Sequence, residues 1–259
     1  MEHNVRDYFP MDDKFQEQGG TSTMDPSPLR RFLGSKIGTK MASYKYSQYK
    51  RLKFEKKRKK LRQPHVIEYF HQVDDPYSHL AAQLLKSFKD KYDVQIRCNV
   101  VSQVTDASIP EPELLRKLSI KDAQNIAPHY DLLFPNGALA PNDKWIDLAQ
   151  TVLVAMNDEE FINNLSSIST ALWSGDLDTL KRFFKEFVSS NDIEHSMIID
   201  DNNAKRNQLG HYSAAMFFYG DEWYWGVDRL YHLESRLKEL ALDISEKKEV
   251  FVAPKKEVT

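Results

Sequence analysis

The segment from Pro64 to Val101 constrains the fold of this 259-residue chain most strongly. The run HVIEYFHQV after Pro64 has the β-branched and aromatic content of a buried strand, and VQIRCNVV (94–101) has the same character. Between them, from Pro76 to Tyr92, apolar residues recur at intervals of three and four, which is typical of an amphipathic helix. Strand, helix and strand within about forty residues predict a βαβ unit with parallel strands and a right-handed connection.

A helical block follows this unit, and the strand pattern then returns. Residues 111–205 are mostly helix-forming. After Gly210, AMFFY and EWYW, separated by turn residues, predict a β-hairpin, and DRLYHLESRLKELAL predicts a last helix. The fold class is therefore α/β: a thioredoxin-like fold (βαβ, then β-hairpin and helix) with an α-helical domain inserted in the middle. We predict a thioredoxin-like domain over 64–104 and 206–243, an inserted helical domain over 105–205 and a polar tail over 244–259.

The N-terminal quarter of the chain differs in charge from the rest. Residues 29–62 carry fourteen basic side chains and one acid, in a chain whose net charge is −2. Residues 1–38 contain scattered Gly and Pro without a sustained period, which predicts a disordered or loosely packed N-terminus. Residues 39–63 predict a basic helix or linker. Its segment 44–62 either contacts a polyanion, such as nucleic acid or an anionic membrane, or is a solvated helix that docks on the acidic body.

Composition excludes several classes of function. The single cysteine, Cys98, excludes two-cysteine disulfide oxidoreductase chemistry within the chain, and its place in a strand predicts an inert residue. The first residues lack an apolar signal core, and the longest nearly apolar run, LAQTVLVAM, is too short for a bilayer, so we expect no transmembrane segment and a cytoplasmic protein. We predict no metal site, because no standard ligand spacing joins His71, His79, His211, Asp74 and Asp75.

Three segments occur in an order that is known from one protein family: VDDPYSHLA (73–81), DAQNIAPHYDLLFP (122–135) and GHYSAAMFFYGDEWYWGVDRLYHLE (210–234). With them, residues 66 to about 242 resemble the DsbA-like branch of the thioredoxin superfamily, and within it the group of 2-hydroxychromene-2-carboxylate isomerases and kappa-class glutathione transferases. The resemblance implies glutathione as cofactor and a small organic molecule as substrate.

The resemblance places the reactive centre at the start of the helix after the first strand. Free N–H groups and the helix dipole stabilise a thiolate there, but the matching position of this chain is Asp75, whose carboxylate would repel a thiolate. The alternative role of Asp75 is helix capping, with Pro76 in the first turn. Ser78 stands where a second redox cysteine would be. The predicted catalytic residues are Asp75, Tyr77 and Ser78.

The opposite wall of the predicted pocket comes from the segment 210–234. Ala215 matches the position of the family's cis-proline, so we expect a trans peptide and a reshaped wall. Asp228 matches the aspartate that holds the amino end of glutathione, and its alternative role is to cap the last helix, with Arg229 on the surface. The aromatic residues Trp223, Tyr224 and Trp225 either pack the sheet or stack on a ligand. The predicted ligand-binding residues are Ala214, Ala215, Trp225, Asp228 and Arg229.

Two functions remain open at this stage. The first is a DsbA-like thioredoxin-fold protein related to glutathione-dependent isomerases and transferases, acting on a small organic substrate without a cysteine nucleophile. The alternative is a non-catalytic thioredoxin-like binding or scaffolding module that uses the basic N-terminal arm as a contact surface. A homo-oligomer is compatible with the sequence.

Overall fold

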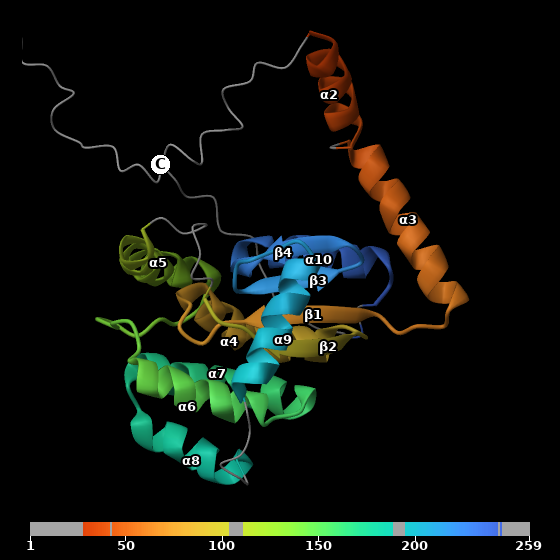
Figure 1. Ribbon diagram of the computed structural model, residues 1–259. Coiled ribbons are helices and arrows are strands. Elements are labelled where there is room, and N and C mark those ends of the chain that lie inside the picture. Colours follow the sequence, from red (N-terminus) through yellow and green to blue (C-terminus); the bar gives the residue numbers. More distant parts are fainter. Residues whose placement is uncertain (1–27, 42, 104–110, 189–194, 243, 245–259) are drawn as a thin grey trace, which may run out of the picture. The chain divides into compact units, whose positions relative to one another are not determined.

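The computed structural model describes residues 28–41, 43–103, 111–188, 195–242 and 244 (Figure 1). The chain forms two compact units, one ending at Leu61 and one beginning at Arg62. The first unit contains helices α2 (Pro28–Met41) and α3 (Tyr44–Lys60), and the second contains the sheet and the remaining helices. This division lies close to the predicted start of the folded domain at residue 64.

The four strands of the second unit form one mixed sheet. They are β1 (Val66–His71), β2 (Gln95–Val100), β3 (Met216–Tyr219) and β4 (Glu222–Trp225), in the order β2-β1-β3-β4. β1 and β2 are parallel, whereas β3 is antiparallel to both β1 and β4. In β1 the side chains of Ile67, Tyr69 and Phe70 are completely buried. The predicted βαβ unit and hairpin are therefore confirmed, and β1 is an interior strand.

The helix α4 (Pro76–Lys91) connects the two parallel strands and begins the core packing. It buries Leu80, Ala81, Leu85 and Phe88, which are the residues at the predicted three- and four-residue intervals. α4 contacts the final helix α10 (Gly226–Glu239) and helix α7 (Asp158–Ser174) of the inserted block. The first core helix thus joins the sheet to the helical insertion.

The inserted block contains α5 (Pro112–Ile126), the 3-10 turn η3 (Ala127–Tyr130), α6 (Asp143–Val154), α7, α8 (Leu177–Phe187) and α9 (His195–Gln208). α6, α7 and α8 pack on one another, and α9 contacts β2 (Figure 1). α9 extends beyond residue 205, so a continuous helix crosses the boundary that the sequence predicts between the insertion and the thioredoxin-like domain. Lys205 on α9 donates to Glu68 on β1 at 2.6 Å, which ties this helix to the sheet.

A buried ion pair ties the first and last core helices together. The Lys91 ammonium lies 3.3 Å from a Glu234 carboxylate oxygen, and the Tyr92 hydroxyl donates to the same oxygen at 3.0 Å. Both charged side chains are almost fully buried. Because the ammonium group and the carboxylate pair with each other, neither charge is left uncompensated in the core.

Residues 1–38 are predicted to be disordered or loosely packed, and the structure describes only residues 28–38 of this segment. They belong to the helix α2, which contradicts disorder, while the described side chains of α2 are exposed and in this sense loosely packed. The helix begins with Pro28, a favoured first residue, and Gly34 and Gly38 weaken it by only about 1 kcal/mol each without ending it. A new helix, α3, begins after Ser43, whose hydroxyl accepts from the Tyr46 amide at 3.3 Å. Of the predicted polar tail, only Ile244 is described.

Candidate functional site

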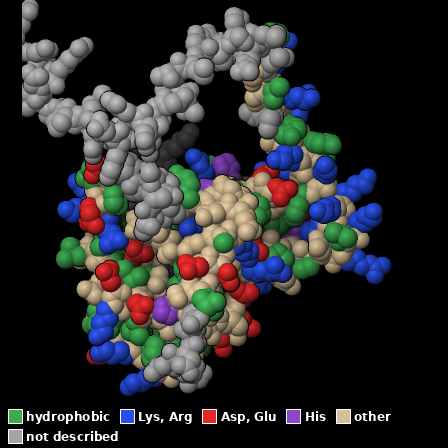
Figure 2. Space-filling view, viewed as in Figure 1, with side chains coloured by type: hydrophobic (Ala, Val, Ile, Leu, Met, Phe, Trp, Pro, Cys, Tyr) green, Lys and Arg blue, Asp and Glu red, His purple; other side chains and the backbone are tan. Residues whose placement is uncertain are grey.

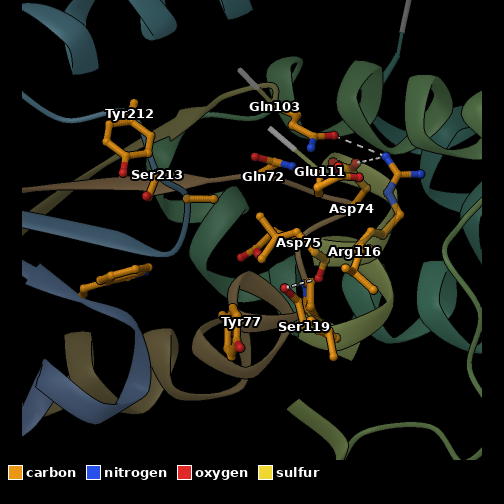
Figure 3. A pocket seen from close by; sticks show the side chains of 16 residues that line it. Gln72, Asp74, Asp75, Tyr77, Gln103, Glu111, Arg116, Ser119, Tyr212 and Ser213 are labelled. Atoms are coloured by element: carbon orange, nitrogen blue, oxygen red, sulfur yellow. Dashed lines mark hydrogen bonds and ion pairs between the residues drawn. The ribbon is translucent and has the colours of Figure 1, made fainter. Parts of the chain in front are cut away.

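A cavity of about 470 Å³ lies at the edge of the sheet where β1 and β2 end (Figure 3). Because β1 and β2 are parallel, the residues that follow them meet at the same edge, where ligands of open α/β sheets commonly bind. The charged and amide side chains of its lining come from these strand ends, the start of α4 and the start of α5: Gln72, Asp74, Asp75, Gln103, Glu111 and Arg116.

The other side of the cavity is apolar and aromatic. Three leucines on the exposed surface of α5 face it from one side, and two half-exposed aromatic rings flank it from the loop before β3 and the end of β4. A cavity with apolar walls and a few polar groups is typical of sites for small organic molecules. These residues are Leu114, Leu115, Leu118, Tyr212 and Trp225.

Asp75 is both the cap of α4 and a wall of the cavity. Its carboxylate accepts from the Ser78 amide at 2.6 Å, and Pro76 follows as the first residue of the helix, so the predicted capping is confirmed. Burial raises the pKa of Asp75 to about 6, against hydrogen bonds from Ser78 that lower it. A carboxyl with this pKa is present in both protonation states near neutral pH, which suits a general acid or base.

Arg116 on α5 pairs with the neighbouring aspartate rather than with Asp75. Its guanidinium donates to Asp74 at 3.4 Å and to the Gln103 side chain at 3.3 Å. Figure 3 shows Arg116 turned toward these two residues, while Asp75 lies closer to the middle of the lining. The negative charge of Asp74 raises the pKa of Asp75. Because Arg116 pairs with Asp74, the arginine weakens this effect and so lowers the pKa of Asp75 indirectly.

Replacing that arginine provides a test of the electrostatics. In Arg116→Gln, the negative charge of Asp74 loses its partner, so we expect the pKa of Asp75 to rise by roughly half a unit or more. A carboxyl-carbon NMR titration of Asp75 measures this shift. Arg97→Gln is the matched control, because Arg97 pairs with Glu68 and is not in the cavity lining. An unchanged or lower pKa in Arg116→Gln would show that the pair does not act on Asp75.

The two other predicted catalytic residues occupy different positions. Tyr77 lines the cavity, and its hydroxyl donates to Asp122 on α5 at 2.7 Å. Burial and this carboxylate raise the pKa of Tyr77, so the phenol stays protonated at neutral pH. Ser78 is completely buried and does not line the cavity; its hydroxyl accepts from the Gln72 amide at 3.3 Å. Tyr77 can therefore contact a ligand in the cavity, whereas Ser78 is buried and holds the loop between β1 and α4 in place.

Some of the predicted ligand-binding residues line the cavity, and the others lie outside it. Ala214 lines the cavity, but Ala215 is fully buried beside it, and the described residues contain no cis peptide bond. The backbone of Ala215 has a φ of 53°, and its carbonyl accepts from the Gly226 amide at 2.8 Å. The cis-proline position is thus filled by a trans peptide in the left-handed region, which turns the chain into β3 and leaves Ala214 at the wall.

Trp225 lines the cavity, whereas the two aromatic residues before it pack the sheet. Trp225 is 53% exposed, while Tyr224 is buried and Trp223 contacts the rings of Phe70 and Phe218. Trp223 also donates to the Leu209 carbonyl at 3.1 Å. Since neighbouring residues of a strand point to opposite faces, Trp225 is directed away from the side that Tyr224 packs. It is the aromatic residue of the hairpin that can stack on a ligand.

Asp228 and Arg229 lie outside the cavity lining. Both side chains are exposed, and α10 begins at Gly226, two residues earlier than the sequence predicts. Trp225 occupies the capping position and makes no side-chain cap bond, so Asp228 is not the cap. It lies within the first turn, where its charge favours the helix dipole.

Several cavity residues are absent from the sequence-based prediction: Gln72, Gln103, Glu111, Arg116, Tyr212 and Ser213. Gln103 had a usable signal, because it directly follows the second of two parallel strands. Arg116 had no such signal, since the leucines of PELLRKL have the three- and four-residue spacing of one ordinary apolar helix face. Tyr212 and Ser213 are in a loop with no distinctive pattern.

Comparison with known proteins supports the fold but not an activity. No family model and no curated protein matches the chain. A candidate protein disulfide isomerase from Nitrosomonas europaea superposes with a TM-score of 0.52 at 13% identity, over 69% of this chain and 98% of that one. A 2-hydroxychromene-2-carboxylate isomerase superposes with a TM-score of 0.48 at 20% identity, over 68% and 96%.

The superposition on the Nitrosomonas europaea protein shows a shared fold, and the strand order and the helical insertion of this chain agree with it. The described residues include no helix long and apolar enough to cross a membrane, and they contain no group of three or more potential metal ligands. Burial raises the pKa of the lone thiol, Cys98, which disfavours its thiolate. The second unit has the fold of DsbA-like thioredoxin-fold proteins, and Asp75 lies at the start of its first core helix.

Proposed function

We propose that the protein is a small-molecule enzyme of the isomerase type that moves a proton with the carboxyl of Asp75. The observation that carries this proposal is the position of Asp75: a carboxyl with a pKa of about 6, placed at a helix start and in the wall of an apolar cavity. In the reaction, the carboxylate removes a proton from a carbon next to a carbonyl, and the same carboxyl returns a proton at another atom. The atoms of substrate and product balance, and no thiol is needed.

The charge of the lining favours neutral or cationic substrates. Among the lining residues, Asp74, Asp75 and Glu111 are acidic and Arg116 is basic. An anion would meet an excess of negative charge, whereas a cation can bind Asp75 and the faces of Trp225 and Tyr212. Glutathione carries carboxylates, and Asp228, predicted to hold its amino end, is outside the lining. We therefore do not include glutathione in the proposed reaction, and we expect it not to change the rate.

Hydrogen–deuterium exchange at a simple ketone tests the proton transfer. 2-Tetralone is neutral, bicyclic and has acidic hydrogens beside its carbonyl. In D₂O at pH 7.5 we expect the protein to accelerate exchange at these carbons at least ~100-fold over buffer, the usual range for general base catalysis. The rate should rise with pH through about 6 as Asp75 ionises. Adding glutathione distinguishes thiol dependence: a strong acceleration would contradict the thiol-free reaction.

The same assay separates the enzyme from the non-catalytic alternative. Saturable quenching of tryptophan fluorescence by 2-tetralone without any exchange would support a binding module and contradict the proposed reaction. Trp225 is the expected reporter, because it is half exposed and lines the cavity. Trp225→Phe should lose most of the quenching and keep the exchange.

A matched pair of probes tests the charge preference separately. 1-Naphthylmethylamine and 1-naphthoate share a ring system and differ in the sign of their charge. At pH 7.5 we expect the amine to bind roughly tenfold more tightly or better, because an adjacent opposite charge is worth about 1 kcal/mol or more in a partly buried site. Asp75→Asn should remove most of this difference. Tighter binding of the naphthoate would contradict an acidic site.

A further inference from the structure

The helix α3 of the N-terminal unit carries an unusual concentration of exposed positive charge. Seven lysines on this single helix are exposed, and in Figure 2 blue side chains gather along it. Its single acid, Glu55, forms an ion pair with Arg58 at 3.0 Å, so one acid stands against seven exposed lysines. The exposed lysines are Lys45, Lys50, Lys53, Lys56, Lys57, Lys59 and Lys60.

The lysines form a convex face. A helix turns by about 100° per residue, which places all seven within about half of the circumference of α3, over a length of about 22 Å. On a flat anionic surface only a narrow stripe of such a half-cylinder can make contact. A groove with negative charge on both flanks can contact the whole of it. The shape of the charged face therefore favours a concave partner.

The apolar residues of α3 argue against insertion into a membrane. A helix that lies in a bilayer interface has a separate apolar face opposite its charges. Here the exposed apolar residues Tyr49 and Leu52 are interspersed among the lysines, and Tyr44 is the one exposed apolar residue of α3 outside the lysine face, so α3 has no continuous apolar face. The lysine face would have to carry its charges into the hydrocarbon with these side chains.

From these observations we infer that α3 binds duplex nucleic acid, lying in the major groove of B-form DNA and contacting the phosphates on both flanks. The major groove is about 12 Å wide and a helix with its side chains about 10–12 Å, so the two shapes match. Lysine ammonium groups bind phosphate as point charges, so binding is independent of base sequence. This activity is separate from the cavity of the second unit and does not depend on the proposed reaction.

Fluorescence anisotropy of the full chain with a labelled 20-base-pair duplex tests this inference. Each phosphate contact contributes about −0.9 to the slope of log K against log salt, and we expect a slope of about −4 to −6. The variant with Lys53, Lys56, Lys57 and Lys60 all changed to Gln keeps helix-forming residues, so α3 should persist. We expect it to bind at least ~100-fold more weakly at 0.1 M salt, with a slope shallower by about 3.

Three comparisons make the result specific. Changing Lys117, Lys121, Lys144 and Lys185 to Gln removes the same charge from exposed sites of the second unit, and it should leave binding unchanged. Vesicles of phosphatidylserine and phosphatidylcholine test the membrane alternative, and duplex RNA tests the preference for a wide major groove. No saturable binding of DNA, an equal loss in both quadruple variants, or tighter binding to vesicles than to duplex DNA would overturn the inference.

Discussion

Asp75→Asn is expected to make the protein more stable at pH 7.5 by about 2 kcal/mol. The folded-state pKa of Asp75 is about 6, above its usual 3.8, because burial disfavours the charged form. Between these values the folded protein binds more protons than the unfolded chain. The free energy of unfolding therefore falls as pH rises through this window, and ionised Asp75 destabilises the fold at neutral pH. Asparagine removes the charge and remains a good helix cap.

Urea unfolding followed by tryptophan fluorescence measures this gain. Asp74→Asn is the matched control, because it also replaces an aspartate before α4 by asparagine. Unlike Asp75→Asn, it breaks the ion pair with Arg116. We expect the control to be neutral or destabilising. At pH 4 the advantage of Asp75→Asn should be nearly gone, since the wild-type carboxyl is then protonated in the folded state. Destabilisation by Asp75→Asn at pH 7.5 would mean that the carboxylate is stabilised by the fold.

The same substitution should abolish the proposed reaction. An amide cannot accept the proton that the carboxylate removes, so exchange of 2-tetralone should fall to the level of buffer, while binding of this neutral ketone should change little. Gain of stability together with loss of activity at one residue is typical of a functional group held in an unfavourable environment. Retained exchange in a folded Asp75→Asn variant would assign the reaction to another residue.

Acid is expected to destabilise the protein steeply below pH 6.5, through two histidines that are buried in the neutral form. Burial lowers the pKa of His71 to about 3 and that of His79 to about 4. His71 accepts or donates a hydrogen bond with the Tyr69 hydroxyl at 3.0 Å, and His79 with the Ser169 hydroxyl at 2.9 Å. Neither pairs with a carboxylate in these contacts, so protonation inside the fold is unfavourable.

The difference in proton binding between the folded and unfolded chain sets the direction of the change in stability. Both folded-state pKa values lie below the ordinary value of 6.5, so the unfolded chain binds more protons between about pH 3 and 6.5. The stabilisation is complete above pH 6.5 and is lost as pH falls. Each histidine lowers the free energy of unfolding by about 1.4 kcal/mol for each pH unit of acidification. Below pH 6, protonation of Asp75 in the folded state raises the free energy of unfolding and offsets the effect of about one histidine. We expect a net loss of about 4 kcal/mol between pH 6.5 and 4.

Urea unfolding at pH 7.5, 6.0, 5.0 and 4.0 checks this dependence. The double variant Tyr69→Phe/His71→Phe keeps two rings of similar volume and leaves no buried hydroxyl without its partner, and it should lose the part of the decline that is due to His71. In Asp75→Asn the decline should be steeper, because the offset is gone. His232→Gln, at an exposed residue of α10, should leave the profile unchanged. Identical profiles in the wild type and the double variant would show that His71 is not the responsible group.

The predicted residues that line the cavity, and those that do not, show which parts of a site a sequence can predict. Asp75 and Tyr77 were assigned because the resemblance places the reactive centre at a helix start, and the capping signal that locates this start is local. Asp228 was assigned by its match to a motif, but the last helix begins at Gly226, with a φ of 62°, and the side chain lies outside the lining. A shift of two residues at a helix start changes the direction of the side chain, and local pattern does not fix it that closely.

The sequence by itself determined the order of the elements, the parallel pairing of β1 with β2 and the cap at Asp75, because these depend on hydrophobic period, β-propensity and turn chemistry between near neighbours. Only the tertiary structure decided that Arg116 neutralises Asp74 and not Asp75, and that Tyr212 and Trp225 close the same cavity. These residues are far apart in the chain. Their distances, and the burial that raises the pKa of Asp75, depend on how α5 and the hairpin pack around the sheet, and no local pattern encodes that packing.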